Sequence, residues 1–229
     1  MGKIIYTSHS DKGDVNFVAG TISFISEGNG DYKDKVQNIS MNISEYDPAT
    51  KKTVNKTLQL AFWNSDSPEK PQLATQVKQA KLQAGHFILV VCGTIADAGA
   101  TRKDGSPIVK ATAFEFRFNH RRILEVTTEK DTYENNIICG RVALVSDSEN
   151  PYIRIPVNRG RDEERTTDWY TVFFNEKLRD SAKKYIKKGL PICVYTQKVD
   201  EKERDGNTSL VTTAMSYVLG SEPKVAAAS

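Results

Sequence analysis

The stretch DWYTVFFNEKLRDSAKKYIKKG, residues 168–189, decides the fold of the second half of the chain. Its first part alternates like a strand, which puts on one face Trp169, Thr171, Phe173 and Asn175. The other face of that strand receives Tyr170, Val172 and Phe174. A helix is predicted next, ending near Gly189, because helical spacing relates Leu178, Ala182, Tyr185 and Ile186.

Apolar, β-rich runs surround this strand-to-helix unit. Two precede it, at 137–145 and 152–158, and two follow it, at 190–199 and 209–220. The first half repeats the order, with strands expected at 17–26, 35–47, 56–64, 86–97 and 108–118. Its helix is expected in 70–85, with one face formed by Leu73, Val77, Ala80 and Ala84.

Five strands with one helix between the third and the fourth is the order of an OB-fold, a small Greek-key barrel. The sequence therefore predicts an all-β protein with one helix per domain, built as two tandem OB-folds. Two unrelated small β domains are the alternative. Landmarks that pair between the halves are Gly20 with Gly140, Trp63 with Phe174, and Gly85 with Gly189.

The expected domain limits follow from this repeat. The first OB-fold domain takes residues 1–122, a polar linker 123–134, the second OB-fold domain 135–220, and a disordered tail 221–229. The composition, 38% hydrophobic and 27% charged over 229 residues, is typical of a soluble globular protein. The sequence has neither a run of about 20 apolar residues nor a signal peptide, so we expect a cytoplasmic protein with no membrane partner.

The sequence gives little support for catalysis. The three histidines are isolated, no phosphate-binding glycine motif occurs, and the three cysteines are far apart with no C-x-x-C pair. We therefore expect no enzyme, no cofactor and no metal, and we interpret the cysteines as buried thiols. The formal net charge of only +3 means that any nucleic-acid affinity comes from local patches.

The second half resembles the bacterial single-stranded DNA-binding protein family over residues 137–220. The segments that carry the resemblance are ICGRVA, IPVNRG, RTTDWYTVFFNEKLRDSAKKYIKKGLPICVYTQ and TTAMSYVLG. The first half resembles the family more weakly, through VAGTIS, LAFWN and LQAGHFILVVCGTI. The chain is thus identified as a tandem member of this family.

The resemblance implies sequence-tolerant binding of single-stranded DNA on the second, third and fourth strands, in DNA replication and repair. Because family members bring four OB-folds together, a chain with two is expected to form a homodimer. Two departures stand out. The acidic C-terminal tip that recruits partners is absent, since the chain ends EPKVAAAS, and the loop KVDEKERDGN lacks an aromatic residue. A plasmid, phage or other mobile-element protein would fit these departures.

Base stacking needs exposed aromatic rings, and every base offers a π-face to them. The resemblance places Trp169 on the DNA-facing side, and Phe173 follows by alternation, although Trp169 packed in a core or an interface is the alternative. In the first half Trp63 and Phe62 are both candidates, because a one-residue shift of register exchanges the faces.

Phosphate contacts are expected from cations in the loops. The second half offers Arg154, Arg159, Arg161 and Arg165, whereas a solvated loop neutralised by its own acidic residues is the alternative. The first half offers Tyr46, Lys51, Lys52 and Arg102. An OB-fold also serves RNA-binding proteins and protein-interaction adaptors, so these functions are the competing hypotheses.

Overall fold

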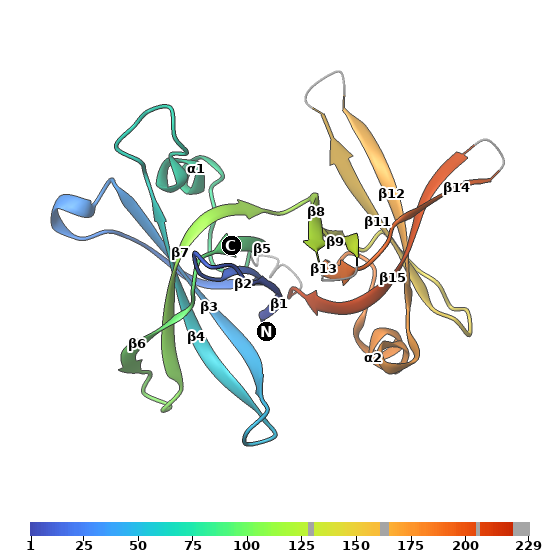
Figure 1. Ribbon diagram of the computed structural model, residues 1–229, viewed down its shortest axis with the longest axis horizontal. Coiled ribbons are helices and arrows are strands. Elements are labelled where there is room, and N and C mark those ends of the chain that lie inside the picture. The colour runs from blue at the N-terminus through green and yellow to red at the C-terminus, as the bar shows by residue number, and fades with distance from the viewer. Residues whose placement is uncertain (128–130, 161–164, 205–206, 222–229) are drawn as a thin grey trace, which may run out of the picture. The chain divides into compact units, whose positions relative to one another are not determined.

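The chain forms two units, of which the first spans Met1–Phe116 and the second begins at Arg117. The computed structural model describes residues 1–127, 131–160, 165–204 and 207–221 (Figure 1). The tail predicted for 221–229 therefore lies outside the described residues except for Ser221.

The first unit is a barrel that its long strand β2 closes. Residues 16–21 of β2 pair with β5, and residues 22–27 pair with β3, which closes the ring β2-β3-β4-β7-β5. Strand β1 pairs with β2 outside this ring, and β6 pairs with β7. The elements of the first unit are β1 (Lys3–Ser8), β2 (Val15–Glu27), η1 (Gly30–Tyr32), β3 (Val36–Asp47), β4 (Lys52–Trp63), α1 (Leu73–Gln79), β5 (Phe87–Cys92), β6 (Ala96–Thr101) and β7 (Pro107–Arg117).

The second unit repeats this ring with its first strand interrupted. Strand β9 pairs with β13, and the short β10 pairs with β11. Strands β9 and β10 together therefore make the two pairings that the single strand β2 makes in the first unit. The elements of the second unit are β8 (His120–Thr127), β9 (Thr132–Arg141), β10 (Leu144–Val145), β11 (Tyr152–Arg159), β12 (Thr166–Phe174), α2 (Glu176–Tyr185), β13 (Pro191–Thr196), β14 (Asp200–Arg204) and β15 (Asn207–Leu219). Each unit has the strand order of an OB-fold, so the prediction of an all-β chain with tandem OB-folds is confirmed.

Alternation along the strands builds the two cores. The first core contains Ile39, Met41, Leu58, Leu60 and Phe62, and the second contains Ile153, Ile155, Tyr170, Val172 and Phe174. Each first barrel strand carries a glycine at a position where another residue approaches closely. A Cβ atom on Gly140 would lie 2.6 Å from Cγ2 of Ile155, and one on Gly20 would lie 2.9 Å from Cα of Gly2.

Both helices are shorter than the sequence predicts. Helix α2 buries Ala182 as expected, but Tyr185 is exposed, so its assignment to the buried face is wrong. Ile186 is already extended, and Gly189, at φ 87°, belongs to the turn that follows rather than to the helix end. Helix α1 stops at Gln79 because the chain turns at Lys81, at φ 48°, which leaves Ala84 exposed outside the helix.

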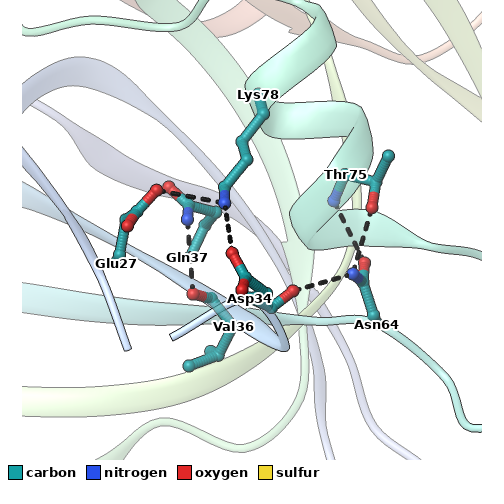
Figure 2. A network of polar contacts seen from close by, with 7 residues as sticks. All are labelled: Glu27, Asp34, Val36, Gln37, Asn64, Thr75 and Lys78. Carbon is teal, nitrogen blue, oxygen red and sulfur yellow. Dashed lines mark hydrogen bonds and ion pairs between the residues drawn. The ribbon is translucent and has the colours of Figure 1, made fainter. Parts of the chain in front are cut away.

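Helix α1 is fixed by Asn64, the residue that follows β4 (Figure 2). The backbone N–H of Thr75 donates to Oδ1 of Asn64 at 3.0 Å, and Nδ2 of Asn64 donates to Oγ1 of Thr75 at 3.0 Å. Nζ of Lys78 lies 3.0 Å from a carboxylate oxygen of Glu27 and 3.3 Å from one of Asp34. The hydrogen bond that Lys78 donates to the carboxylate of Glu27 raises the pKa of Lys78. These contacts join the helix to the strands beneath it.

The segment 123–134, expected to be a linker, carries secondary structure instead. Strand β8 pairs with β9 from His120 opposite Cys139 to Thr127 opposite Thr132, and 128–130 lie outside the described residues. Leu124 is the buried hydrophobic residue of β8. A strand with so little apolar surface has the polar composition of a linker, which explains the difference.

Candidate nucleic-acid interface

The outer face of the β11–β12 ladder gathers the aromatic residues of the second unit. Tyr152 lies opposite Phe173, Arg154 opposite Thr171, and Pro156 opposite Trp169. The alternate residues of both strands fill the barrel core. The structure therefore places Trp169, 39% exposed, on the outer face, as the resemblance implied, and Phe173 on the same face, as alternation predicted.

Two pairs of flat side chains lie beside each other on this face. The guanidinium carbon of Arg154 is 4.8 Å from the centre of the Trp169 ring. The rings of Tyr152 and Phe173 are 5.5 Å apart at an interplanar angle of 49°. Nε of Arg154 is shielded from solvent and has no hydrogen-bond partner in the described part of the chain. Stacking on the indole therefore holds Arg154 in place.

Neighbouring strands extend the same face. Leu144 of β10 lies opposite Arg154, and Oγ1 of Thr171 is 3.3 Å from Oγ of Ser209 on β15. Met215, also on β15, is an exposed hydrophobic residue. The outer face of the sheet thus offers apolar and aromatic surface with one arginine at its centre, a combination suited to unpaired bases and a phosphate.

The other arginines of this region differ from Arg154. Nε of Arg159 lies 2.6 Å from Oδ2 of Asp168, and its Nη2 donates to Oδ1 of the same carboxylate at 2.8 Å. By alternation both residues lie on the face opposite to Trp169, so Arg159 is not brought together with the stacking residues. Arg165 is exposed just before β12, whereas Arg161 lies outside the described residues.

Next to this ion pair, Tyr170 packs in the core beneath the ladder. Its hydroxyl donates to Oδ2 of Asp168 at 3.5 Å, and the guanidinium of Arg121 lies 5.7 Å from its ring centre. Burial raises the pKa of Tyr170, so its phenol stays neutral. Asp168, Arg159 and Tyr170 therefore form a connected polar group on the side of the ladder away from Trp169.

In the first unit the candidate Phe62 is wrong. Phe62 is fully buried and packs edge-on against Phe116 at 5.8 Å, because Leu58, Leu60 and Phe62 all point into the barrel. Trp63 is 40% exposed at the end of β4, where its ring meets the ring of Tyr32 at 5.7 Å. Trp63 is thus the accessible residue of the pair.

Three loop candidates of the first unit come together at the β3–β4 turn, and Arg102 contacts the same two strands farther from that turn. Tyr46 and Lys52 are exposed where β3 and β4 meet their turn, and Lys51 occupies the turn itself at φ 54°. Nη1 of Arg102 donates to Oδ1 of Asn42 at 3.0 Å and to Oγ1 of Thr57 at 3.3 Å. Arg102 is therefore engaged on the outer face of the sheet.

Three aromatic residues, of which two are exposed and one is half-buried, were missed by the sequence analysis. Tyr152 belongs to the β11–β12 face, and Phe24 and Phe114 lie on β2 and β7 of the first unit. Tyr152 was detectable, because it alternates with Ile153 and Ile155, which the pattern already assigns to the core. Phe24 was not, because an irregularity between Ile22 and Phe24 breaks the alternation of β2.

The described residues bring no three side chains of the His, Cys, Asp and Glu types together as a metal site. Within the same residues, no helix is long and apolar enough to cross a membrane.

Comparison with known proteins finds similar solved structures only. No family model matches the chain, and no curated protein matches it. The chain is similar to a small single-stranded DNA-binding protein from Streptomyces coelicolor, at 26% identity and a TM-score of 0.28, covering 36% of this chain and 92% of that one. It is also similar to the single-stranded DNA-binding protein from Thermus aquaticus, at 11% identity and a TM-score of 0.28, covering 93% and 95%.

A further similar structure is the mitochondrial single-stranded DNA-binding protein Rim1 from S. cerevisiae, at 18% identity and a TM-score of 0.29, covering 39% of this chain and 98% of that one. At such low TM-scores the likeness carries no functional argument. The function has to be argued from the residues of this chain.

Proposed function

We propose that this protein binds single-stranded DNA without strong sequence preference on the outer face of β11 and β12. The observation that carries the proposal is the Arg154–Trp169 stack beside the Tyr152–Phe173 pair, on the sheet face of an OB-fold. Each base that stacks on an aromatic side chain contributes about 1–3 kcal/mol, whatever its identity. Arg154 adds a cation that follows the phosphates.

The test compares the wild-type protein with variants on a fluorescently labelled thymidine oligonucleotide, beside duplex DNA and RNA of matched length. Trp169→Ala and Phe173→Ala should each weaken binding about tenfold or more, because each removes one stacking ring. Tyr185→Ala is the matched control, since Tyr185 is an exposed aromatic residue on α2, off the β11–β12 ladder. Binding of wild-type protein should also weaken as salt is added.

Several outcomes would contradict the proposal. Equal affinity for the duplex, or affinity unchanged in Trp169→Ala and Phe173→Ala, would remove the stacking face from the function. A clear preference for RNA would favour the RNA-binding alternative, and no binding to any nucleic acid would favour an interaction adaptor. Circular dichroism of each variant shows whether the barrel is intact.

We also propose two OB domains with β8 assigned to the second, because β8 pairs with β9. Assembly as a homodimer, action in the cytoplasm and an origin on a plasmid, phage or other mobile element stay predictions from the sequence. Light scattering on the purified full chain distinguishes a dimer from a monomer.

A further inference from the structure

The two barrels can be compared position by position, because the third OB strand pairs in parallel with the last one in both. Phe174 lies opposite Ala214. In the first unit Ala61 lies opposite Thr112, and the residues that follow them are Phe62 and Ala113. We match Phe62 to Phe174 and Ala113 to Ala214, because each is the core-facing residue near the end of the parallel pairing in its unit. All four are buried, which supports the match.

Counting back along the outer face gives the equivalents of the stacking residues. Two-residue steps from this match relate Phe173 to Ala61, Thr171 to Gln59 and Trp169 to Thr57. The cross-strand partners of these three residues in the first unit are Asn38, Ser40 and Asn42, where the second unit has Tyr152, Arg154 and Pro156. The polar residues Thr57, Asn38 and Ser40 thus take the positions of Trp169, Tyr152 and Arg154, and Ala61 takes that of Phe173.

Aromatic residues border this polar surface in the first unit. Phe24, 60% exposed, lies opposite Ser40, and Trp63 lies two residues beyond Ala61 on β4. Phe114, 51% exposed, lies two residues beyond Thr112, the partner of Ala61. Lys110 lies opposite Gln59 on the same outer face.

The polar residues differ in how their hydrogen bonds are used. The Oδ1 atom of Asn42 and the hydroxyl of Thr57 are already engaged by Arg102. The side chains of Asn38, Ser40 and Gln59, here named the amide patch, have no hydrogen-bond partner of their own among the described residues. Each amide carries an unused donor and an unused acceptor on adjacent atoms.

We propose that the amide patch recognises the edge of an unpaired base, preferring adenine, while Phe24, Trp63 and Phe114 flank that base. The edge in question is the one that faces the major groove in duplex DNA. There adenine presents the N6 amino group as donor and N7 as acceptor, which an Asn or Gln amide pairs with bidentately, whereas thymine presents only the O4 acceptor and a methyl group. This inference rests on the proposed binding of single-stranded DNA. The second unit would then bind any base by stacking, and the first unit would add a preference for adenine.

The experiment measures dissociation constants of the full chain for labelled adenine and thymidine oligonucleotides of equal length, and compares variant with wild type for each. For each oligonucleotide, the dissociation constant of the variant is divided by that of the wild type. Stacking between the bases of the free oligonucleotide affects both constants equally, so it does not change this ratio. Asn38→Ala and Gln59→Ala should each weaken adenine binding about fivefold and thymidine binding less than about twofold. Trp169→Ala should weaken both by the same factor.

Asn55→Ala is the matched control, since Asn55 lies on the same face of β4 but accepts a hydrogen bond from Ser44 at 3.0 Å. It should leave the ratio between the two oligonucleotides unchanged. Equal losses for adenine and thymidine in Asn38→Ala and Gln59→Ala would overturn the inference while the proposed function stands. No binding of either oligonucleotide by the wild-type protein would overturn the proposed function itself. Because Gln59 is exposed, its variant is expected to fold even if Asn38→Ala does not.

Discussion

At the scale of the residue, Arg154 is the side chain that brings both a positive charge and a planar group to the proposed DNA-binding face. The central carbon of its guanidinium lies over the Trp169 ring, 4.8 Å from the ring centre, which is a cation–π contact. At a partly exposed site such a contact contributes about 0.5–1 kcal/mol.

Substitutions of Arg154 separate the contribution of its charge to DNA binding from the contribution of its planar guanidinium. We expect Arg154→Lys to keep the salt dependence of oligonucleotide binding but to weaken affinity several-fold, because an ammonium does not stack as a planar guanidinium does. Arg154→Ala should lower both the affinity and the slope of log affinity against log salt concentration. Arg159→Ala is the comparison, since its guanidinium is paired with Asp168, and it should leave the slope unchanged. A slope unaltered in Arg154→Ala would show that this arginine meets no phosphate.

Alternation within a strand predicts faces better than alignment between repeats. The run Leu58, Leu60 and Phe62 already assigns Phe62 to the core, whereas pairing Trp63 with Phe174 as landmarks shifts the register by one residue. The outer position of Trp169 was predicted from the family resemblance, and the unbroken apolar row of Tyr170, Val172 and Phe174 explains it physically. The ion pair of Arg159 with Asp168 could not be predicted, since it depends on the register between two strands.

At the scale of the element, an asparagine side chain accepts a hydrogen bond from a backbone N–H in the first turn of each helix, but from a different place in the sequence. Asn175 directly precedes α2, and its Oδ1 accepts from the backbone N–H of Leu178 at 3.1 Å. Asn64 reaches the third residue of α1, Thr75, across the loop that follows β4. The same chemistry thus satisfies a free backbone donor from adjacent or from distant sequence.

We predict that Asn175→Ala lowers the free energy of unfolding by about 1 kcal/mol, as loss of an N-cap does elsewhere. Asn175→Asp should retain most of that stability, because a carboxylate also accepts the bond and favours the positive end of the helix dipole. Urea denaturation of the three proteins measures the difference. Equal midpoints for the Ala variant and the wild type would mean that strand packing alone fixes the helix start.

Element existence was easier to predict than element ends. The barrel strands and the helix between the third and fourth of them follow from apolar periodicity. Strands β1 and β8 were missed because each packs few apolar side chains, and β8 was taken for a linker. Edge strands of this kind gain their stability from pairing with a neighbour, which composition does not record.

At the scale of the whole molecule, both units bury neutral thiols. Burial raises the pKa of Cys92 in the first unit to about 12. In the second unit Cys139 and Cys193 lie opposite each other on β9 and β13 with their sulfur atoms 2.7 Å apart. Burial raises the pKa of Cys193 well above its ordinary value as well. Folding therefore disfavours the thiolate in each unit.

The sign of the resulting pH dependence follows from linkage. In the unfolded chain the thiols of Cys92 and Cys193 lose their protons near the ordinary pKa of 9.0, whereas in the folded chain they hold them to higher pH. Above that value the unfolded state binds fewer protons, so the free energy of unfolding should fall as the pH rises from about 9 toward 12. Below about pH 8 the same thiols should have no effect.

Urea denaturation at pH 8 and at pH 10.5 measures this loss for the wild type and for Cys92→Ala. Lysines and tyrosines titrate in the same range, so the informative quantity is the difference in loss between the two proteins. Cys92→Ala should lose less stability than the wild type over this interval, although it starts from a less stable core. Equal losses would show that the Cys92 thiol ionises as readily in the folded chain as in the unfolded one.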